Sequence, residues 1–253
     1  MIGLFVFIFG LIVGSFLNVC IYRMPREISP AKGRSFCPHC KKQIAWYDNI
    51  PLFSYIVLLG KCRSCKAKIS IQYFIVELIA GGLFLLTYFY FGITLNFFIY
   101  LILLSGLIIS TFIDIEHRII PDEISIGGVV VGFLIALILA FIKKTPFIIL
   151  DSFLGIIIGG GVIYLTGMLG DFLFKKESMG GGDVKLLAAI GAFLGWKKAL
   201  LSFFIAPVFG AIIGIVVLIK YKDHYIPYGP FLSIGAIIAL FWGDKLLRLL
   251  FWF

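Results

Sequence analysis

The chain has 253 residues, of which 61% are hydrophobic and 14% are charged, and its mean hydropathy is +1.10. A soluble domain cannot bury that much apolar surface, so the composition excludes soluble proteins and indicates an integral membrane protein. A net charge of +9 would favour a nucleic-acid partner in a soluble protein, but in a membrane protein the first question is where the basic residues lie.

Apolar runs that are long enough, or nearly long enough, to cross a bilayer follow one another along the chain, and we expect each to form a helix. The sixth of them is short and interrupted by glycine, so the predicted number of spans is about eight. The runs cover residues 2–21, 71–91, 95–113, 124–142, 147–169, 186–196, 199–219 and 229–250. The sequence therefore predicts an all-α polytopic membrane protein with about eight transmembrane helices.

The first run is followed by the longest polar stretch, residues 22–70, where ten of the 22 Lys and Arg residues lie between Arg23 and Lys68. Lys and Arg are enriched in cytoplasmic loops, so we place this loop inside and both chain ends outside. The first run has no charged segment before it and no small-residue cleavage site, so we expect a retained helix. These features divide the chain into a first transmembrane helix at 1–21, a cytoplasmic loop at 22–70 and a membrane domain at 71–253.

Two Cys-x2-Cys pairs in this loop predict a metal site, with Cys-Pro-His-Cys at 37–40 and Cys-Arg-Ser-Cys at 62–65. Two such hairpins present four thiolates, which complete a tetrahedral shell around Zn²⁺ and leave no open position, so the metal is structural. The alternative, disulfides or free thiols, is less favoured because disulfides are rare in the cytoplasm. The predicted ligands are Cys37, Cys40, Cys62 and Cys65.

The basic character of the loop is, on composition alone, compatible with nucleic-acid binding. The loop lacks the interleaved aromatic and basic residues of single-strand binders, and it is tied to membrane spans. We therefore predict that the protein has the lipid bilayer as a partner and no nucleic-acid partner.

Two aspartates at helix ends are the candidates for chemistry. Asp114 follows the third run, and Asp183 follows Gly180, Gly181 and Gly182 ahead of the sixth run. The predicted topology places both aspartates on the cytoplasmic side. An ionisable acid at bilayer depth is costly and is by default a functional candidate. Two carboxyls that share a proton can activate water and protonate a peptide carbonyl, because burial and like charge raise one pKa. On the residues alone, interfacial helix capping explains the same aspartates equally well.

The residues around these aspartates suggest further roles. The three glycines supply permissive backbone, which lets an extended peptide approach closely, and Lys185 is placed to pair with an acid or to hold a lipid phosphate. Asp122 is a poor partner for Asp114, because it lies roughly 12 Å further along a helix and Pro121 breaks the helix there. We expect Asp122 to be the N-cap of the span that starts at Ile124.

A series of motifs resembles those of the bacterial type IV prepilin peptidases. The motifs occur in the order found in that family and extend over nearly the whole chain. They are GSFLNVCIYRMP at 14–25, CPHC at 37–40, WYDNIP at 46–51, CRSC at 62–65, Ile69-Ser70 to Glu77, Ile113-Asp114 to Pro121-Asp122, MGGGDVKL at 179–186 and IPYGPFL at 226–232.

The resemblance implies an aspartyl endopeptidase of the bacterial inner membrane, related through its Gly-x-Gly-Asp motif to presenilin-like enzymes. It implies that Asp114 and Asp183 are the catalytic pair, and that the substrates are prepilins and pseudopilins cut after a Gly on the cytoplasmic side. Many members also methylate the new N-terminal amine with S-adenosylmethionine, an activity associated with the N-terminal part and its cysteine loop. The chain has no Gly-x-Gly-x-x-Gly nucleotide fingerprint, so methylation rests on the resemblance alone.

Three further residues are candidates for binding the substrate or the methyl donor: Glu77 in the second span, and Asp48 and Asn49 in the turn before Pro51. A structural acid near the interface explains Glu77 equally well. Within the protease class, a peptidase without methyltransferase activity is the alternative. Two other classes stay open, a non-catalytic membrane scaffold and a proton- or metal-coupled transporter, although transporters usually place their acids near the midplane of broken helices. The sequence predicts neither the particular pilins nor the oligomeric state.

Overall fold

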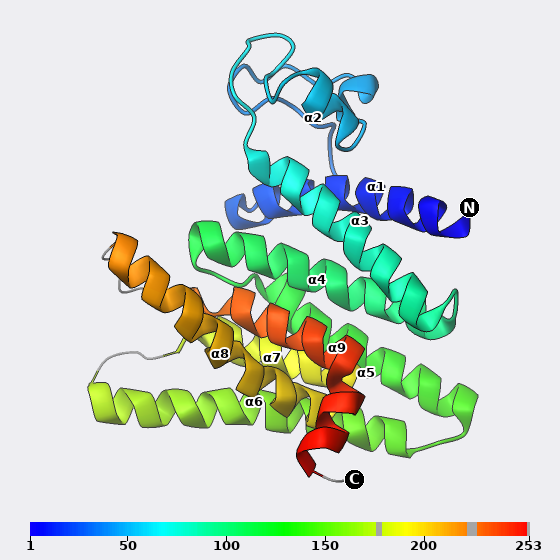
Figure 1. Cartoon of the computed structure of the whole chain (residues 1–253), viewed down its shortest axis with the longest axis vertical. Helices are drawn as coiled ribbons and strands as arrows, with labels where there is room; N and C mark the ends of the chain where they lie inside the picture. The colour runs from blue at the N-terminus through cyan, green and yellow to red at the C-terminus, as the bar shows by residue number, and fades with distance from the viewer. Residues whose placement is uncertain (176–178, 222–226, 252–253) are drawn as a thin grey trace. The chain divides into compact units, whose positions relative to one another are not determined.

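The computed structural model describes residues 1–175, 179–221 and 227–251 (Figure 1). These residues form helices and, apart from two isolated bridges, no strand, which confirms the all-α prediction. The elements are α1 (Ile2–Arg23), η1 (Met24–Arg26), η2 (Trp46–Asn49), α2 (Phe53–Val57), α3 (Ile71–Phe91), α4 (Leu95–His117), α5 (Asp122–Lys143), α6 (Phe147–Phe174), α7 (Gly181–Leu194), α8 (Trp196–Tyr221) and α9 (Gly229–Phe251).

Seven helices within the described ranges, α1, α3, α4, α5, α6, α8 and α9, are long and apolar enough to cross a membrane. The protein is therefore a multi-pass membrane protein. The predicted sixth run instead forms α7, which has only 14 residues between Gly180 and Gly195. At about 1.5 Å per residue it is about 21 Å long, less than the roughly 30 Å of a bilayer core. Gly195, with a φ of 80°, ends the helix in a conformation that favours glycine.

The chain forms two compact units, Met1–Ile109 and Ser110–Phe253, so that α4 begins in the first and ends in the second. The functional division that we predict at residue 70 is not the boundary between these units, and it stays a prediction. The two units are described separately below.

In the first unit, α1 and α3 pack closely because glycines of α1 face α3. A Cβ at Gly10 would lie 2.7 Å from the backbone of α3, and one at Gly14 would lie 2.7 Å from the Cα of Glu77. Such small-residue contacts are typical of helix pairs in membranes. Asn18 Nδ2 adds an interhelical hydrogen bond of 3.0 Å to the Tyr73 carbonyl. The contacts place Glu77 against α1.

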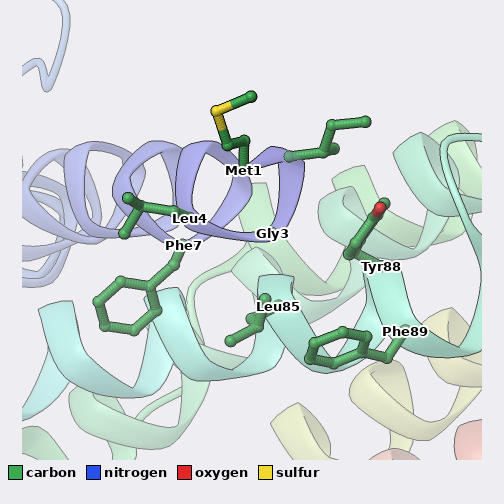
Figure 2. A pocket seen from close by; sticks show the side chains of 8 residues that line it. Met1, Gly3, Leu4, Phe7, Leu85, Tyr88 and Phe89 are labelled. Atoms are coloured by element: carbon green, nitrogen blue, oxygen red, sulfur yellow. The ribbon is translucent and has the colours of Figure 1, made fainter.

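The start of α1 and the end of α3 border an open groove of about 820 Å³ (Figure 2). Apart from the Tyr88 hydroxyl, its side chains are apolar, so the groove offers no acid–base pair and no metal ligand. The lining residues are Met1, Ile2, Gly3, Leu4, Phe7, Leu85, Tyr88 and Phe89.

In the second unit, the short helix α7 packs against α5, α6, α8 and α9. Small residues allow this close packing. Gly155 of α6 meets the backbone of Gly191 of α7, and Gly132 of α5 packs against the Cβ of Ala192. Most of α7 is buried as a result, including Asp183 in its first turn. The packing thus fixes the helix start that carries one of the two candidate aspartates.

Candidate active site and metal centre

Asp114 lies in the last turn of α4, with its side chain buried. The backbone N–H of Gly229, the first residue of α9, donates a hydrogen bond of 2.9 Å to Asp114 Oδ2. The first N–H groups of a helix have no partner inside the helix, and they carry the partial positive charge of the helix dipole. The Asp114 carboxylate therefore serves α9 as a capping group supplied by another helix.

Asp183 is in the first turn of α7 and is also buried. Its carboxylate turns back towards Gly180, the residue before the helix, whose backbone N–H donates to it. An acid at the third helical position that reaches back to the N-cap N–H forms one half of a capping box. Each aspartate is therefore held at the N-terminus of a helix, Asp114 at α9 and Asp183 at α7.

The two carboxyls interact electrostatically. Burial and, second, the negative charge of Asp114 raise the pKa of Asp183 to about 7, while the Gly180 N–H opposes the shift. A carboxyl with this pKa carries its proton in about half of the molecules at neutral pH. The arrangement brings together a proton donor and a second carboxyl that can act as base, which is what hydrolysis of a peptide by water requires. Both side chains also cap helices, so the two interpretations of the sequence are not exclusive.

The glycines beside the aspartates differ in the space around them. A Cβ at Gly229 would lie 2.7 Å from Asp114 Oδ2, and one at Gly182 would lie 3.1 Å from the Cβ of Ile120. The Ile120 side chain also reaches Gly229, so it lies against both helix starts. By contrast, a Cβ at Gly181 would meet nothing within 4 Å. Gly181 is therefore the position of the triplet with open space beside it.

Lys185 pairs with an acid, as one of our expectations had it, and the acid is Asp122. Lys185 Nζ of α7 is 2.7 Å from Asp122 Oδ1 at the start of α5, and both side chains are largely exposed. The predicted N-cap role of Asp122 is wrong, because Pro121 occupies the N-cap and Asp122 is the first helical residue. Its carboxylate is taken by the charged Lys185, a stronger partner than a backbone N–H. The pair ties α7 to the segment that follows Asp114.

The four predicted metal ligands lie together in the loop of the first unit. The Sγ atoms of Cys37, Cys40, Cys62 and Cys65 all lie within 4.8 Å of one another, and none of the four is in a disulfide. Those of Cys37 and Cys65 are 3.8 Å apart. A tetrahedral Zn²⁺ with Zn–S bonds of about 2.3 Å separates its sulfurs by about 3.8 Å. The four sulfurs are therefore placed so that they could hold a metal ion.

The two cysteine pairs share one backbone geometry, which explains why their sulfurs converge. In each pair the first Cys exchanges hydrogen bonds with the residues four and five positions later, and the residue four positions later has a left-handed φ. The bonds are Cys37 N to Lys42 O at 3.0 Å, Lys41 N to Cys37 O at 2.9 Å, Cys62 N to Ala67 O at 2.9 Å and Lys66 N to Cys62 O at 3.0 Å, and the left-handed residues are Lys41 and Lys66.

Glu77, Asp48 and Asn49 lie where the loop of the first unit meets α3. The buried Glu77 carboxylate accepts a hydrogen bond of 2.8 Å from the N–H of Leu52, a residue with a φ of 59° that is unusual for leucine. Arg63, inside the second cysteine pair, forms an ion pair of 2.7 Å with Asp48. Asn49 follows Asp48 in η2. Glu77 and Asp48 therefore have partners within the protein that hold the loop in place.

Gly229 and Ile120 are site residues that sequence reasoning did not single out. Gly229 lies in the motif at 226–232, of which Ile226 is outside the described residues. Pro230 directly after Gly229 is a signal for a helix start, and hence for free N–H groups near the cytoplasmic end of the last span. Nothing in the sequence marks Ile120, because its contacts depend on how three helix ends meet.

Comparisons with known proteins show which family the chain belongs to. The family model "Bacterial Peptidase A24 N-terminal domain" matches residues 8–91, and "Type IV leader peptidase family" matches residues 101–215. The prepilin leader peptidase/N-methyltransferase of Legionella pneumophila is 35% identical and covers 95% of this chain and 91% of its own length. That of Stutzerimonas stutzeri is 36% identical, with 94% and 90% covered.

A third relative, the "Type 4 prepilin-like proteins leader peptide-processing enzyme" of Escherichia coli, is 34% identical and covers 92% of this chain and 91% of its own length. No solved structure matches the chain. The identities exceed 30% over almost the full length of both partners. The chain therefore belongs to the type IV leader peptidase family, the family of the prepilin leader peptidases/N-methyltransferases.

Proposed function

We propose that the protein is a membrane aspartyl endopeptidase with Asp114 and Asp183 as its catalytic pair. Its proposed substrates are type IV prepilins and pseudopilins, whose leader peptide it removes after a glycine. The observation that carries the proposal is the electrostatic pairing of two buried carboxyls, in which burial and the charge of Asp114 raise the pKa of Asp183 to about 7. The names of the relatives supply the substrate class.

In the proposed reaction, Asp114 is the base and Asp183 the acid. Asp114 takes a proton from water while the water oxygen bonds to the scissile carbonyl carbon, and Asp183 gives its proton to the carbonyl oxygen. When the C–N bond of the resulting gem-diol breaks, Asp114 returns its proton to the leaving nitrogen and a hydroxyl proton passes back to Asp183. Both groups end as they began. The raised pKa of Asp183 supports its assignment as the acid. The hydrogen bond that the Gly229 N–H donates to one oxygen of Asp114 supports the assignment of Asp114 as the base.

The glycine triplet and Lys185 are the proposed approach for the substrate backbone. The open space beside Gly181 supports this role, because an extended peptide has to come close to the chain next to Asp183. Lys185, two residues after Asp183, forms an ion pair with Asp122. The pair holds the start of α5 beside the proposed site.

We propose that the metal is Zn²⁺ and that its role is structural. The spacing of the four sulfurs supports this identity, since it matches the edge of a zinc–thiolate tetrahedron. With all four positions taken by cysteine, the ion has no place for substrate or water. Its function in the proposal is to hold the loop that carries Asp48 and Arg63.

We propose that the protein also methylates the new N-terminal amine with S-adenosylmethionine, as the names of the relatives suggest. The methyl donor supplies an electrophilic methyl group. Glu77, Asp48 and Asn49 are the proposed binding residues, because a carboxylate suits both the ammonium of a new N-terminus and the sulfonium of the donor. The buried position of Glu77 and its bond to Leu52 support a fixed carboxylate in this region.

The proposed location is the bacterial inner membrane, with the aspartates and the cysteine loop facing the cytoplasm. Ten of the 22 Lys and Arg residues between Arg23 and Lys68 support this orientation. The proposal holds for a monomer and for an oligomer.

Mass spectrometry tests the proposal. A prepilin-like peptide with a Gly-Phe junction before an apolar run is incubated with the purified protein in detergent, with S-adenosylmethionine. We expect cleavage after the Gly and the mass gain of one methyl group on the new N-terminus. Cleavage without this gain would contradict the methyltransferase part alone, and an intact peptide with folded, metal-loaded protein would contradict the peptidase.

A further inference from the structure

The hydroxyl of Tyr228 is a buried polar group that the proposed mechanism does not use. Its Oη is shielded from solvent and has no hydrogen-bond partner among the residues that the structure describes. Leaving such a group unpaired costs about 1–3 kcal/mol, so its presence calls for an explanation. A partner that arrives with the substrate provides one.

Two observations place Tyr228 at the aspartate pair. The next residue, Gly229, donates its N–H to Asp114 Oδ2 at 2.9 Å, so the peptide unit between Tyr228 and Gly229 adjoins one carboxyl. The other carboxyl acts on the phenol, because burial and then the charge of Asp183 raise the pKa of Tyr228 to about 12. Tyr228 therefore keeps its proton wherever the aspartates work, and it can act only as a neutral donor or acceptor.

The backbone of Tyr228 is fixed as well. Its carbonyl accepts the N–H groups of Phe231 and Leu232 at 3.0 Å and 3.2 Å, so the residue closes the first turn of α9. The phenol is held near Asp183 without a hydrogen bond to it. A residue whose task was to position Asp183 would make that bond in the free protein. The Tyr228 O–H is instead available to donate a hydrogen bond to a substrate bound in the site.

We propose that Tyr228 is a third catalytic residue, whose O–H donates a hydrogen bond to the oxygen of the scissile carbonyl as negative charge develops there. This inference rests on the proposed peptidase function and deepens it. Tyr228 transfers no proton, since Asp183 supplies the proton that the oxygen finally takes. A fixed donor aimed at a developing oxyanion is typically worth about 100- to 1,000-fold in kcat.

The test is Tyr228→Phe, measured with the prepilin-like peptide beside the unchanged protein and Asp183→Asn. The variant loses only the hydroxyl, and because that hydroxyl is buried without a partner, we expect the melting temperature to stay the same or to rise and the metal content to stay unchanged. We expect kcat to fall by about 100-fold or more and KM to change by less than about threefold, since the bond forms in the transition state. Tyr164→Phe, on the exposed face of α6, is the matched control and should match the unchanged protein.

The outcomes separate the two proposals. If the unchanged protein cleaves, Asp183→Asn does not, and Tyr228→Phe keeps its kcat within about threefold, the role of Tyr228 is overturned while the peptidase stands. A raised KM with unchanged kcat overturns it too. If the unchanged protein does not cleave, the function fails and this inference with it.

A second variant serves if Tyr228→Phe does not fold. Placing 3,5-difluorotyrosine at 228 keeps the shape and lowers the pH at which the hydroxyl loses its proton. A phenolate cannot donate, so kcat should fall more steeply at alkaline pH than in the unchanged protein. Identical pH profiles would overturn the inference.

Discussion

Asp114 Oδ2 and the backbone N–H of Gly229 are joined by a hydrogen bond of 2.9 Å that connects the last turn of α4 to the first residue of α9. The contact leaves no room at position 229, since a Cβ there would lie 2.7 Å from the same oxygen. One carboxyl of the proposed pair is thus placed by a helix start, and the residue type at that start decides where the carboxyl points.

Gly229→Ala should therefore inactivate the protein while leaving it folded. The added methyl group pushes the Asp114 carboxylate away from its donor, and a displaced catalytic group commonly costs about 100-fold in rate. Cleavage of the prepilin-like peptide by the purified variant measures the loss. Gly161→Ala in α6, where a Cβ meets nothing within 4 Å, is the matched control and should keep full activity. Full activity of Gly229→Ala would show that the contact does not position the base.

The pH profile of cleavage should fall on the alkaline side of neutrality. Asp183 has to be protonated to act as acid, and burial together with the charge of Asp114 raises its pKa to about 7, so kcat should decline as the pH rises through this value. A rate that stays constant from about pH 6 to about pH 9 would contradict the assignment of Asp183 as the acid.

The same shift affects stability. The pKa of Asp183 is higher in the folded protein than its usual 3.8, so the folded state binds more protons between the two values. The stabilisation is present below the lower value and is lost as the pH rises through about 7. Asp183→Asn should flatten this part of the curve of melting temperature against pH in detergent, and Asp244→Asn, on an exposed side chain, should not. An unchanged slope in Asp183→Asn would contradict the raised pKa.

Exchanging the charges of Asp122 and Lys185 should restore what each single change removes. Asp122→Lys and Lys185→Asp each place like charges together across the 2.7 Å contact between α5 and α7, and the double variant rebuilds the pair. Because both side chains are exposed, we expect losses of about 1 kcal/mol or less in stability, with cleavage reduced by about two- to fivefold. A double-mutant cycle on melting temperature and kcat/KM measures the coupling.

The pair of Lys198 and Asp244, 2.9 Å apart between α8 and α9, is the matched control for this exchange, and reversing it should leave cleavage unchanged. If the Asp122–Lys185 exchange restores stability but not cleavage, Lys185 contacts the substrate itself. If the single changes have no effect on either quantity, the pair does not help to hold the site.

Elemental analysis of the purified protein should find zinc at about one ion per chain. Cys62→Ser should lose the metal, lower the melting temperature and make residues 22–70 sensitive to protease, because the four sulfurs within 4.8 Å of one another no longer have a cation to hold them. Cys20→Ser, outside the cluster in α1, should retain the ion. Unchanged zinc content in Cys62→Ser would contradict the four-thiolate site.

Hydropathy and charge were enough to predict most of the fold, since each long apolar run became a helix long enough to span. The sixth run differs because glycines at 180 and 195 bound it and because α5 and α6 pack onto its small residues, so it is a short, buried helix. Its length follows from tertiary packing, which hydropathy does not describe.

The candidate site, like the fold, could be predicted from the sequence only in part. The cysteine spacing predicted a cluster because both pairs form local hairpins of one geometry. Asp122 was misjudged because its partner, Lys185, is distant in sequence. The roles of Gly229 and Tyr228 depend on where α9 begins relative to Asp114, and no local pattern carries that information.

Cleavage by Asp114→Asn and Asp183→Asn tests the central claim most directly. Both variants should fold, because the Asn oxygen at 114 can still accept the Gly229 N–H and because Asp183 is already protonated in about half of the molecules at neutral pH. We predict that each lowers kcat for the prepilin-like peptide by about 1,000-fold or more, with melting temperature and zinc content close to those of the unchanged protein. Turnover within about tenfold of the unchanged protein in either variant would contradict the catalytic pair.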